Sequence, residues 1–233
     1  MTKFKIVYIS ASPADAPALE NDAEFKTLKD ALIKGEHRSL FEQNPEYVPK
    51  TGTNDLSDIF RTENTKLILH FSAHGNAMGS LLLENQQGNS TVIKPAHLAN
   101  YLQTHKTDIS GVLFSACDSD ELAEETAQKL DTFAIGFRNP VTIKAAKNFT
   151  YDFYINLLKN GNIQDAFLSA KSSSELDGSK HQAKLFGIEK GKMLFDKQDS
   201  TDLQKLYQTL KALLNKLDNK EVQKVLNKSD IQG

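Results

Sequence analysis

Two short apolar segments of the sequence each end in a residue that can take part in nucleophilic chemistry. Residues 67–75 read LILHFSAHG, and residues 111–119 read GVLFSACDS. The first segment carries His74 directly before a glycine, and the second carries Cys117, the only cysteine among 233 residues. A thiol is a nucleophile only as a thiolate, which an imidazole base can generate. The pair therefore indicates nucleophilic catalysis by a cysteine.

Both segments have the pattern of buried parallel strands, because β-branched and large apolar residues are bounded by small polar ones. Neighbouring strands of a sheet lie about 5 Å apart. If the two segments are adjacent, the imidazole and the thiol lie within reach of each other. They would then share the edge at which open α/β sheets build their sites.

The residues beside His74 and Cys117 favour the same chemistry. Cys117 directly precedes the start of a predicted helix at 118–120, where the helix dipole favours negative charge on sulfur. Gly75 lacks a Cβ and permits a close backbone approach. The amides of Gly75 and Cys117 are therefore predicted to hold the oxyanion of a tetrahedral intermediate. His74 would take the thiol proton and later give it to the leaving amine.

A metal site and two simpler interpretations compete with this prediction. His70, His74 and Cys117, with Asp118, could ligate a metal, but a structural zinc site is disfavoured without a second cysteine. Taken alone, Cys117 is typical of a small packing residue and His74 of a turn residue. The sequence has no G-x-S-x-G elbow and no glycine-rich nucleotide loop.

The rest of the sequence up to about residue 190 alternates predicted strands and helices. Besides the two segments above, strands are predicted at 4–10, 37–48, 132–137 and 184–188, with a hairpin at 79–84 and 91–93. Helices are predicted at 21–34, 55–62, 95–104, 121–130, 142–159 and 163–174. This order predicts an α/β fold, a mostly parallel sheet flanked by helices on both faces.

The sequence changes character at residue 200. Leucines at helical spacing lie on one face of a predicted amphipathic helix, with lysines opposite: Leu203, Leu206, Leu210, Leu213, Leu214 and Leu217. The sequence therefore predicts an α/β domain at 1–195 and a C-terminal helical appendage at 200–233. The appendage either packs on the sheet as a terminal helix or acts in regulation, binding a regulator or sensor protein or another copy of itself.

The composition excludes several partners. Lysine and arginine number 28 against 30 aspartate and glutamate, giving a net charge of −2, so the net charge does not attract the chain to nucleic acid or to an anionic membrane. No stretch approaches the roughly 20 apolar residues that a membrane span needs. A lone cysteine persists best in a reducing compartment, which predicts a cytoplasmic location.

The residues so far described resemble the CHAT domain, a branch of the caspase-like cysteine peptidases. The resemblance covers about residues 4–190 and rests on IVYISASP at 6–13, HFSAHG at 70–75, LFSAC at 113–117 and AIGFRNPV at 134–141. It implies a caspase-like fold and a peptide-cleaving dyad in which His74 is the base and Cys117 the nucleophile. It also implies that no metal or organic cofactor takes part.

The resemblance also indicates which residues would contact a protein substrate. In caspase-like enzymes the residue two before the nucleophile commonly lines the first specificity pocket, and here that residue is Ser115. Acidic side chains from nearby loops would favour a Lys or Arg side chain, whereas Arg138 would favour an acidic one. The acidic candidates are Asp15, Asp22, Asp118 and Asp120, which can equally be helix caps and solvated charges.

We therefore expect a cytosolic cysteine endopeptidase that cleaves protein substrates. Members of the CHAT family occur in bacterial stress and defence systems, where an added sensor module commonly controls the protease. The alternative is a catalytically weak binding or signalling module of the same fold that acts through its C-terminal helix.

Overall fold

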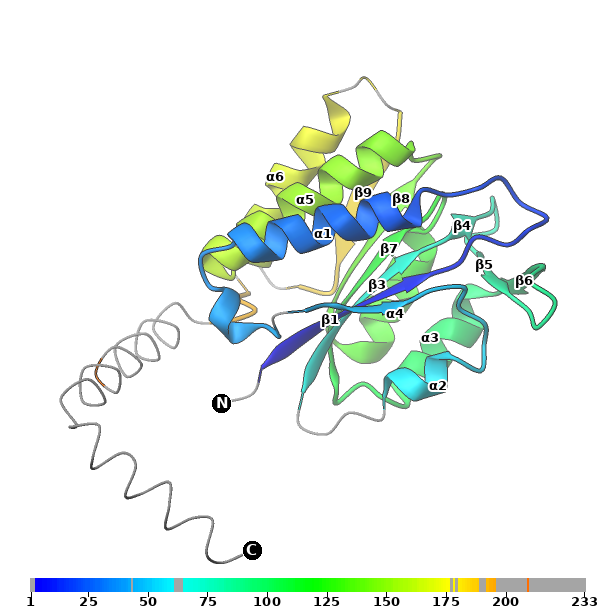
Figure 1. The fold of residues 1–233 in the computed structure, drawn as a ribbon, viewed down its shortest axis with the longest axis horizontal. Helices are drawn as coiled ribbons and strands as arrows, with labels where there is room; N and C mark the ends of the chain where they lie inside the picture. Colours follow the sequence, from blue (N-terminus) through cyan, green and yellow to red (C-terminus); the bar gives the residue numbers. More distant parts are fainter. Residues whose placement is uncertain are drawn as a thin grey trace, which may run out of the picture. The chain divides into compact units, whose positions relative to one another are not determined.

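The computed structural model describes residues 3–42, 44–60, 65–176, 178, 180–188, 192–195 and 209. The chain divides into two compact units, Met1–Leu194 and Phe195–Gly233. All of the helices and strands named below belong to the first unit (Figure 1). The predicted appendage at 200–233 lies outside the described residues apart from Thr209, so its helix and its role stay predictions.

The first unit is built on a six-stranded sheet with the strand order β2-β1-β3-β7-β8-β9 (Figure 1). Its strands are β1 (Phe4–Ser10), β2 (Glu46–Val48), β3 (Lys66–Ser72), β7 (Ile109–Ser115), β8 (Phe133–Arg138) and β9 (Gln182–Phe186). All neighbouring strands run parallel except β9, which is antiparallel to β8. The predicted mostly parallel sheet is confirmed, and the histidine strand β3 lies directly beside the cysteine strand β7.

Helices cover both faces of this sheet (Figure 1). One face carries α1 (Asn21–Lys34), α5 (Ile143–Asn160) and α6 (Ile163–Glu175), and the other carries α2 (Leu56–Ile59), α3 (Pro95–Gln103) and α4 (Asp120–Leu130). The six helices predicted between residues 21 and 174 are confirmed, although α2 is shorter than expected. Helix α5 begins where the Thr142 hydroxyl accepts a hydrogen bond from the Ala145 amide at 3.1 Å, and it ends at Gly161, whose φ of 71° is left-handed.

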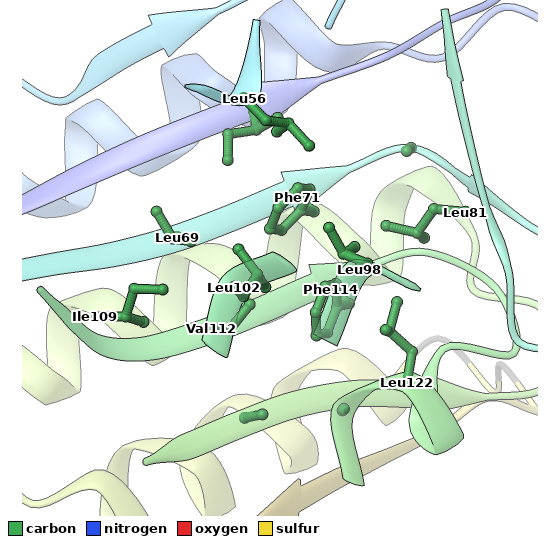
Figure 2. Close-up of a cluster of buried hydrophobic side chains, with 14 of the residues drawn as sticks. Leu56, Leu69, Phe71, Leu81, Leu98, Leu102, Ile109, Val112, Phe114 and Leu122 are labelled. Atoms are coloured by element: carbon green, nitrogen blue, oxygen red, sulfur yellow. The ribbon is translucent and has the colours of Figure 1, made fainter. Parts of the chain in front are cut away.

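The face toward α2, α3 and α4 forms an apolar core (Figure 2). Phe71 of β3 and Phe114 of β7 stack with ring centroids 5.3 Å apart, and both side chains are fully buried. Leu98 and Leu102 of α3 and Leu122 of α4 belong to the same buried cluster. This packing holds the middle strands in place next to the residues that end them.

A small antiparallel sheet lies at the end of β3. Its strands are β4 (His74–Gly75), β5 (Leu81–Glu84) and β6 (Ser90–Ile93), in the order β4-β5-β6. The chain leaves the large sheet after Ser72, and His74 is already paired with Leu82 of β5. The predicted hairpin is therefore present, and it gives the histidine a second set of backbone neighbours.

Two predicted strands differ from the observed ones. The segment 37–48 contains a short 3₁₀ helix, η1 (Arg38–Leu40), and only its end forms strand β2. The last strand ends at Phe186 because Gly187 adopts a left-handed φ of 73° and lies against the Thr132 carbonyl, where a side chain would collide. Among the described residues, no helix is long and apolar enough to cross a membrane.

Replacing Phe114 by alanine should remove a large buried side chain from the strand that ends near Cys117. We expect Phe114→Ala to lower the free energy of unfolding by about 3–5 kcal/mol. Met78→Ala is the control, because Met78 is 74% exposed and its loss should change stability by less than about 0.5 kcal/mol. Urea titrations compare the two variants, and equal effects would contradict the described core.

Candidate active site

Strands β3 and β7 bring His74 and Cys117 to the same edge of the sheet. The paired register ends at Ser72 opposite Ser115, and the Ala73 amide then lies 3.4 Å from the Ser115 carbonyl oxygen. Beyond this pair, His74 and Cys117 line one pocket. Both residues are partly exposed, so the pocket is open to solvent at this point.

Gly75 lies directly against the backbone of Cys117. A Cβ at Gly75 would stand 2.8 Å from the Cys117 carbonyl carbon and 3.1 Å from its nitrogen, and it would collide with the carbonyl oxygen. Only glycine permits this approach. The amide of Cys117 makes no hydrogen bond to any residue that the structure describes.

The imidazole of His74 is oriented by the loop between β1 and α1. Its Nε2 lies 2.7 Å from the carbonyl oxygen of Pro17. A carbonyl oxygen only accepts hydrogen bonds, so Nε2 carries the proton that is donated to Pro17. In the neutral ring Nδ1 is then unprotonated and can accept a proton.

The turn after Cys117 is tied to the end of β8 and the residue after it. Asp118 has a left-handed φ of 51°, and its carboxylate accepts a hydrogen bond from the Asn139 amide at 3.1 Å. The Ser119 hydroxyl accepts from the Phe137 amide at 3.0 Å. Helix α4 begins at Asp120, whose carboxylate binds the guanidinium of Arg138 at 2.7 Å. These contacts hold Cys117 at the top of β7, close to the start of α4.

Helices α1 and α5 supply the walls of the pocket. The segment leading into α1 and its first residues contribute Leu19, Glu20, Asn21 and Glu24, and the start of α5 contributes Val141, Thr142, Ile143 and Ala146. Ser72 and Ser115, which end β3 and β7, complete it together with Ala73, Ala116 and the two candidate catalytic residues. Ser115 thus lines the pocket, as the sequence predicts for a substrate-binding residue.

The other residues predicted to bind substrate do not line this pocket. Asp118, Asp120 and Arg138 hold the turn after Cys117. Asp15 accepts hydrogen bonds from the Ser90 amide and hydroxyl at 2.8 and 2.9 Å, and the Ser90 bonds hold the pKa of Asp15 below its usual range. The carboxylate of Asp22 accepts from the Tyr47 hydroxyl at 2.6 Å.

Sequence reasoning missed Glu20 and Glu24, the two acidic residues that do line the pocket. Glu20 is exposed and lies 3.6 Å from the ammonium of Lys147. Glu24 is only 5% exposed. The pattern of α1 contains the signal for it, because Glu24 occupies the same helical stripe as the buried Leu28 and Ala31. A carboxylate within an apolar stripe indicates a buried polar partner.

The partners of Glu24 form a buried polar cluster on the α1 and α5 face of the sheet. Its Oε1 accepts hydrogen bonds from the Thr150 hydroxyl at 2.8 Å and from His70 Nε2 at 3.3 Å. Its Oε2 accepts from the hydroxyls of Ser72 at 2.8 Å and Tyr8 at 3.1 Å. Each carboxylate oxygen therefore has two donors, which satisfies the buried charge.

The pKa values of the ionisable groups in this cluster are strongly shifted. Burial opposes ionisation of Glu24 and raises its pKa, but the hydrogen bond and the charge of His70, followed by hydrogen bonds from Ser72 and Thr150, outweigh burial and lower the pKa to about 2. Burial, and then the Glu24 carboxylate, raise the pKa of the Tyr8 hydroxyl. The phenol therefore remains a hydrogen-bond donor.

His70 belongs to this cluster. Its ring is fully buried, and its nitrogens contact Glu24 and the Tyr154 hydroxyl, the latter at 3.3 Å. In the part of the chain that the structure describes, no group of three or more His, Cys, Asp or Glu side chains is arranged to hold a metal ion.

No protein-family model and no curated protein sequence matches the chain. Among solved structures, the Drosophila initiator caspase Dronc is similar, with a TM-score of 0.53 and 10% identity over 78% of this chain and 78% of that chain. The Arg-specific cysteine proteinase gingipain R is similar, with a TM-score of 0.52 and 8% identity over 82% of this chain and 47% of that one. The chain therefore has a caspase-like α/β fold, whereas its membership of the CHAT family stays a prediction.

The buried carboxylate of Glu24 should make stability depend on pH in the acid range. Its pKa in the folded protein, about 2, is below the usual 4.5, so its contribution is complete above about pH 5 and is lost as the pH falls toward 2. We expect Glu24→Gln to lower the free energy of unfolding by up to about 3 kcal/mol at pH 6. The difference from the wild type should shrink between pH 5 and 2 in urea titrations. A difference that stays constant over this range would contradict the ionised state of Glu24.

Proposed function

We propose that the protein is a cysteine peptidase in which Cys117 is the nucleophile and His74 the general base. The observation that carries the proposal is that the two residues line one pocket at the ends of adjacent strands, with His74 Nε2 held on the Pro17 carbonyl. That contact leaves Nδ1 as the nitrogen that can receive the thiol proton. The caspase-like fold, which is also that of two cysteine proteases, agrees with this chemistry.

Each step assigns a task to a group of this chain. The Cys117 thiol gives its proton to His74 Nδ1, and the thiolate attacks the carbonyl carbon of the scissile peptide bond. The tetrahedral intermediate collapses, the C–N bond breaks, and the imidazolium of His74 protonates the leaving amine. Water then attacks the thioester with His74 again as base, which releases the carboxylic acid and restores the thiol.

The amides of Gly75 and Cys117 are proposed to stabilise the oxyanion of both tetrahedral intermediates. Gly75 is in contact with the Cys117 backbone, and the Cys117 amide has no described partner. Two fixed amide donors near a developing negative charge contribute to catalysis because they need no reorganisation when the charge forms.

The charge of the pocket favours a basic side chain at the cleaved bond. Apart from His74, its charged lining residues among those described are Glu20 and Glu24, and Glu24 is already satisfied by four donors. Glu20 has a side chain that is 60% exposed, and among the described residues its one charged partner is Lys147 at 3.6 Å. We therefore assign the preference for Lys or Arg to Glu20.

The cellular setting remains a prediction from the sequence. A lone cysteine and the resemblance to CHAT domains support a cytosolic endopeptidase in a bacterial stress or defence system. Control by a regulator, a sensor protein or self-association through residues 200–233 is part of the same proposal. The alternative, a catalytically weak binding module, would leave the pairing of His74 with Cys117 without a chemical role.

The test of the catalytic pair is labelling by a panel of peptide reagents that carry a thiol-directed warhead. Cys117→Ala should abolish labelling, and His74→Ala should slow it by roughly 100- to 10,000-fold because the thiol loses its base. His97→Ala is the matched control, since His97 is exposed on α3 and should react as the wild type does. Equal, slow labelling of the wild type and His74→Ala would favour the binding module.

The assignment of Glu20 is tested with fluorogenic peptides that differ only in the residue before the cleaved bond. We expect Lys and Arg peptides to be cleaved faster than Asp peptides, and Glu20→Gln to reduce kcat/KM for the basic peptides by roughly two- to fivefold. Glu175→Gln is the control, because Glu175 is also exposed and lies near one lysine, on α6. A preference that survives Glu20→Gln unchanged would refute the assignment.

A further inference from the structure

Glu24 hydrogen-bonds to three other elements, which is more than the packing of α1 on the sheet requires. Its four donors come from β1, β3 and α5, and the carboxylate itself comes from α1. An apolar side chain would pack α1 on the sheet without the cost of burying a charge. A fully satisfied buried network instead fixes the directions in which its members lie.

One of these hydrogen bonds fixes the residue at which β3 ends, just before His74. Ser72 is the last residue of β3, two positions before His74, and its hydroxyl donates to Glu24 Oε2 at 2.8 Å. The same hydroxyl lies 3.0 Å from Oδ1 of Asn21, the first residue of α1. The end of β3 is therefore held against the first turn of α1.

The chain just before the start of α1 also holds the imidazole ring of His74. Pro17, four residues before Asn21, supplies the carbonyl that holds the imidazole of His74. The Tyr8 hydroxyl, which donates to Glu24, also lies 3.2 Å from the Asn21 carbonyl oxygen. A displacement of the start of α1 would thus move both the backbone before His74 and the acceptor of its ring.

The region where the chain changes sheets depends on these contacts. Beyond Ser72 the sheet offers β3 one backbone contact, from the Ala73 amide to Ser115 at 3.4 Å, and His74 is then paired with Leu82 of β5. The carbonyl oxygen of Ser72 accepts a hydrogen bond from the Ala11 amide at 3.0 Å, and the 2.8 Å side-chain hydrogen bond to Glu24 is the shortest of these restraints.

We infer that Glu24 is a positioning residue of the site: through Ser72 and the first turn of α1 it holds His74 in the orientation that allows its ring to act on Cys117. The inference rests on the proposed function. Glu24 also lines the pocket, but its oxygens are occupied by four donors of the chain, which separates its role from the substrate-binding role of Glu20.

The experiment measures the rate at which iodoacetamide alkylates Cys117 between pH 5 and 9.5. Because Cys117 is the only cysteine, the reaction reports this thiol alone, and it requires no knowledge of the substrate. Ser72→Ala and Glu24→Gln test the inference. Thr150→Val is the matched control, since it also removes one hydroxyl donor to Glu24, but from α5 and not from β3.

The His74-dependent alkylation rate is the wild-type rate at pH 6 minus the rate of His74→Ala. We expect this His74-dependent rate to fall roughly 10- to 100-fold in Ser72→Ala and in Glu24→Gln, because small displacements of a catalytic group cost this much. Thr150→Val should stay within about twofold of the wild type. Urea titrations of Ser72→Ala and Thr150→Val should give similar stabilities, which separates positioning from loss of fold.

Nuclear magnetic resonance of ¹⁵N-labelled histidines gives a readout that does not depend on reactivity. The wild type should show His74 as the Nε2–H tautomer, and Ser72→Ala should show a mixture of tautomers. If Ser72→Ala reacts as the wild type does, or if Thr150→Val loses as much rate, the positioning role is wrong while the proposed function stands. If the wild type and His74→Ala react alike, the proposed function is wrong and this inference falls with it.

Discussion

Strands β3 and β7 run parallel and end opposite each other at Ser72 and Ser115, and the candidate site depends on that pairing. With this register the residues that follow Ser72 and those that follow Ser115 leave the sheet at the same edge. Gly75 then lies against the Cys117 backbone at a distance that no other residue type permits. A shift of one residue would turn the alternate side chains of β3 to the other face and separate the pair.

The two faces of the sheet stabilise the site in different ways. Toward α2, α3 and α4 the contacts are apolar, and such packing tolerates exchange between residues of similar volume. Toward α1 and α5 the cluster around Glu24 contributes Glu24 and Ser72 to the lining of the pocket, and its hydrogen bonds are directional. The apolar face therefore holds the strands together, and the polar cluster orients the residues at which β3 leaves the sheet.

The acidic residues around Cys117 divide into structural ones and those available to a ligand. Asp118 and Asp120 are bound to Asn139 and Arg138 at the end of β8, and so they shape the turn after the nucleophile. Glu24 is satisfied within the protein. Glu20 is the acidic side chain of the pocket that keeps solvent contact, and Lys147, its charged partner among the residues described, is itself partly exposed. A count of acidic residues near the site thus says little until their partners are known.

The sequence alone determined the α/β class, most of the helices and strands, and the placement of His74 and Cys117 just beyond two strand ends, because these depend on local apolar patterns and on residues that end predicted strands. It did not predict the short η1 helix, the early end of β9 at Gly187, or the pocket residues Glu20 and Glu24. Only the tertiary structure decided that Pro17 holds His74 and that Glu24 holds Ser72. The partners in these contacts are 57 and 48 residues apart, and hydrogen bonds over such separations form only when the sheet brings α1 against β3.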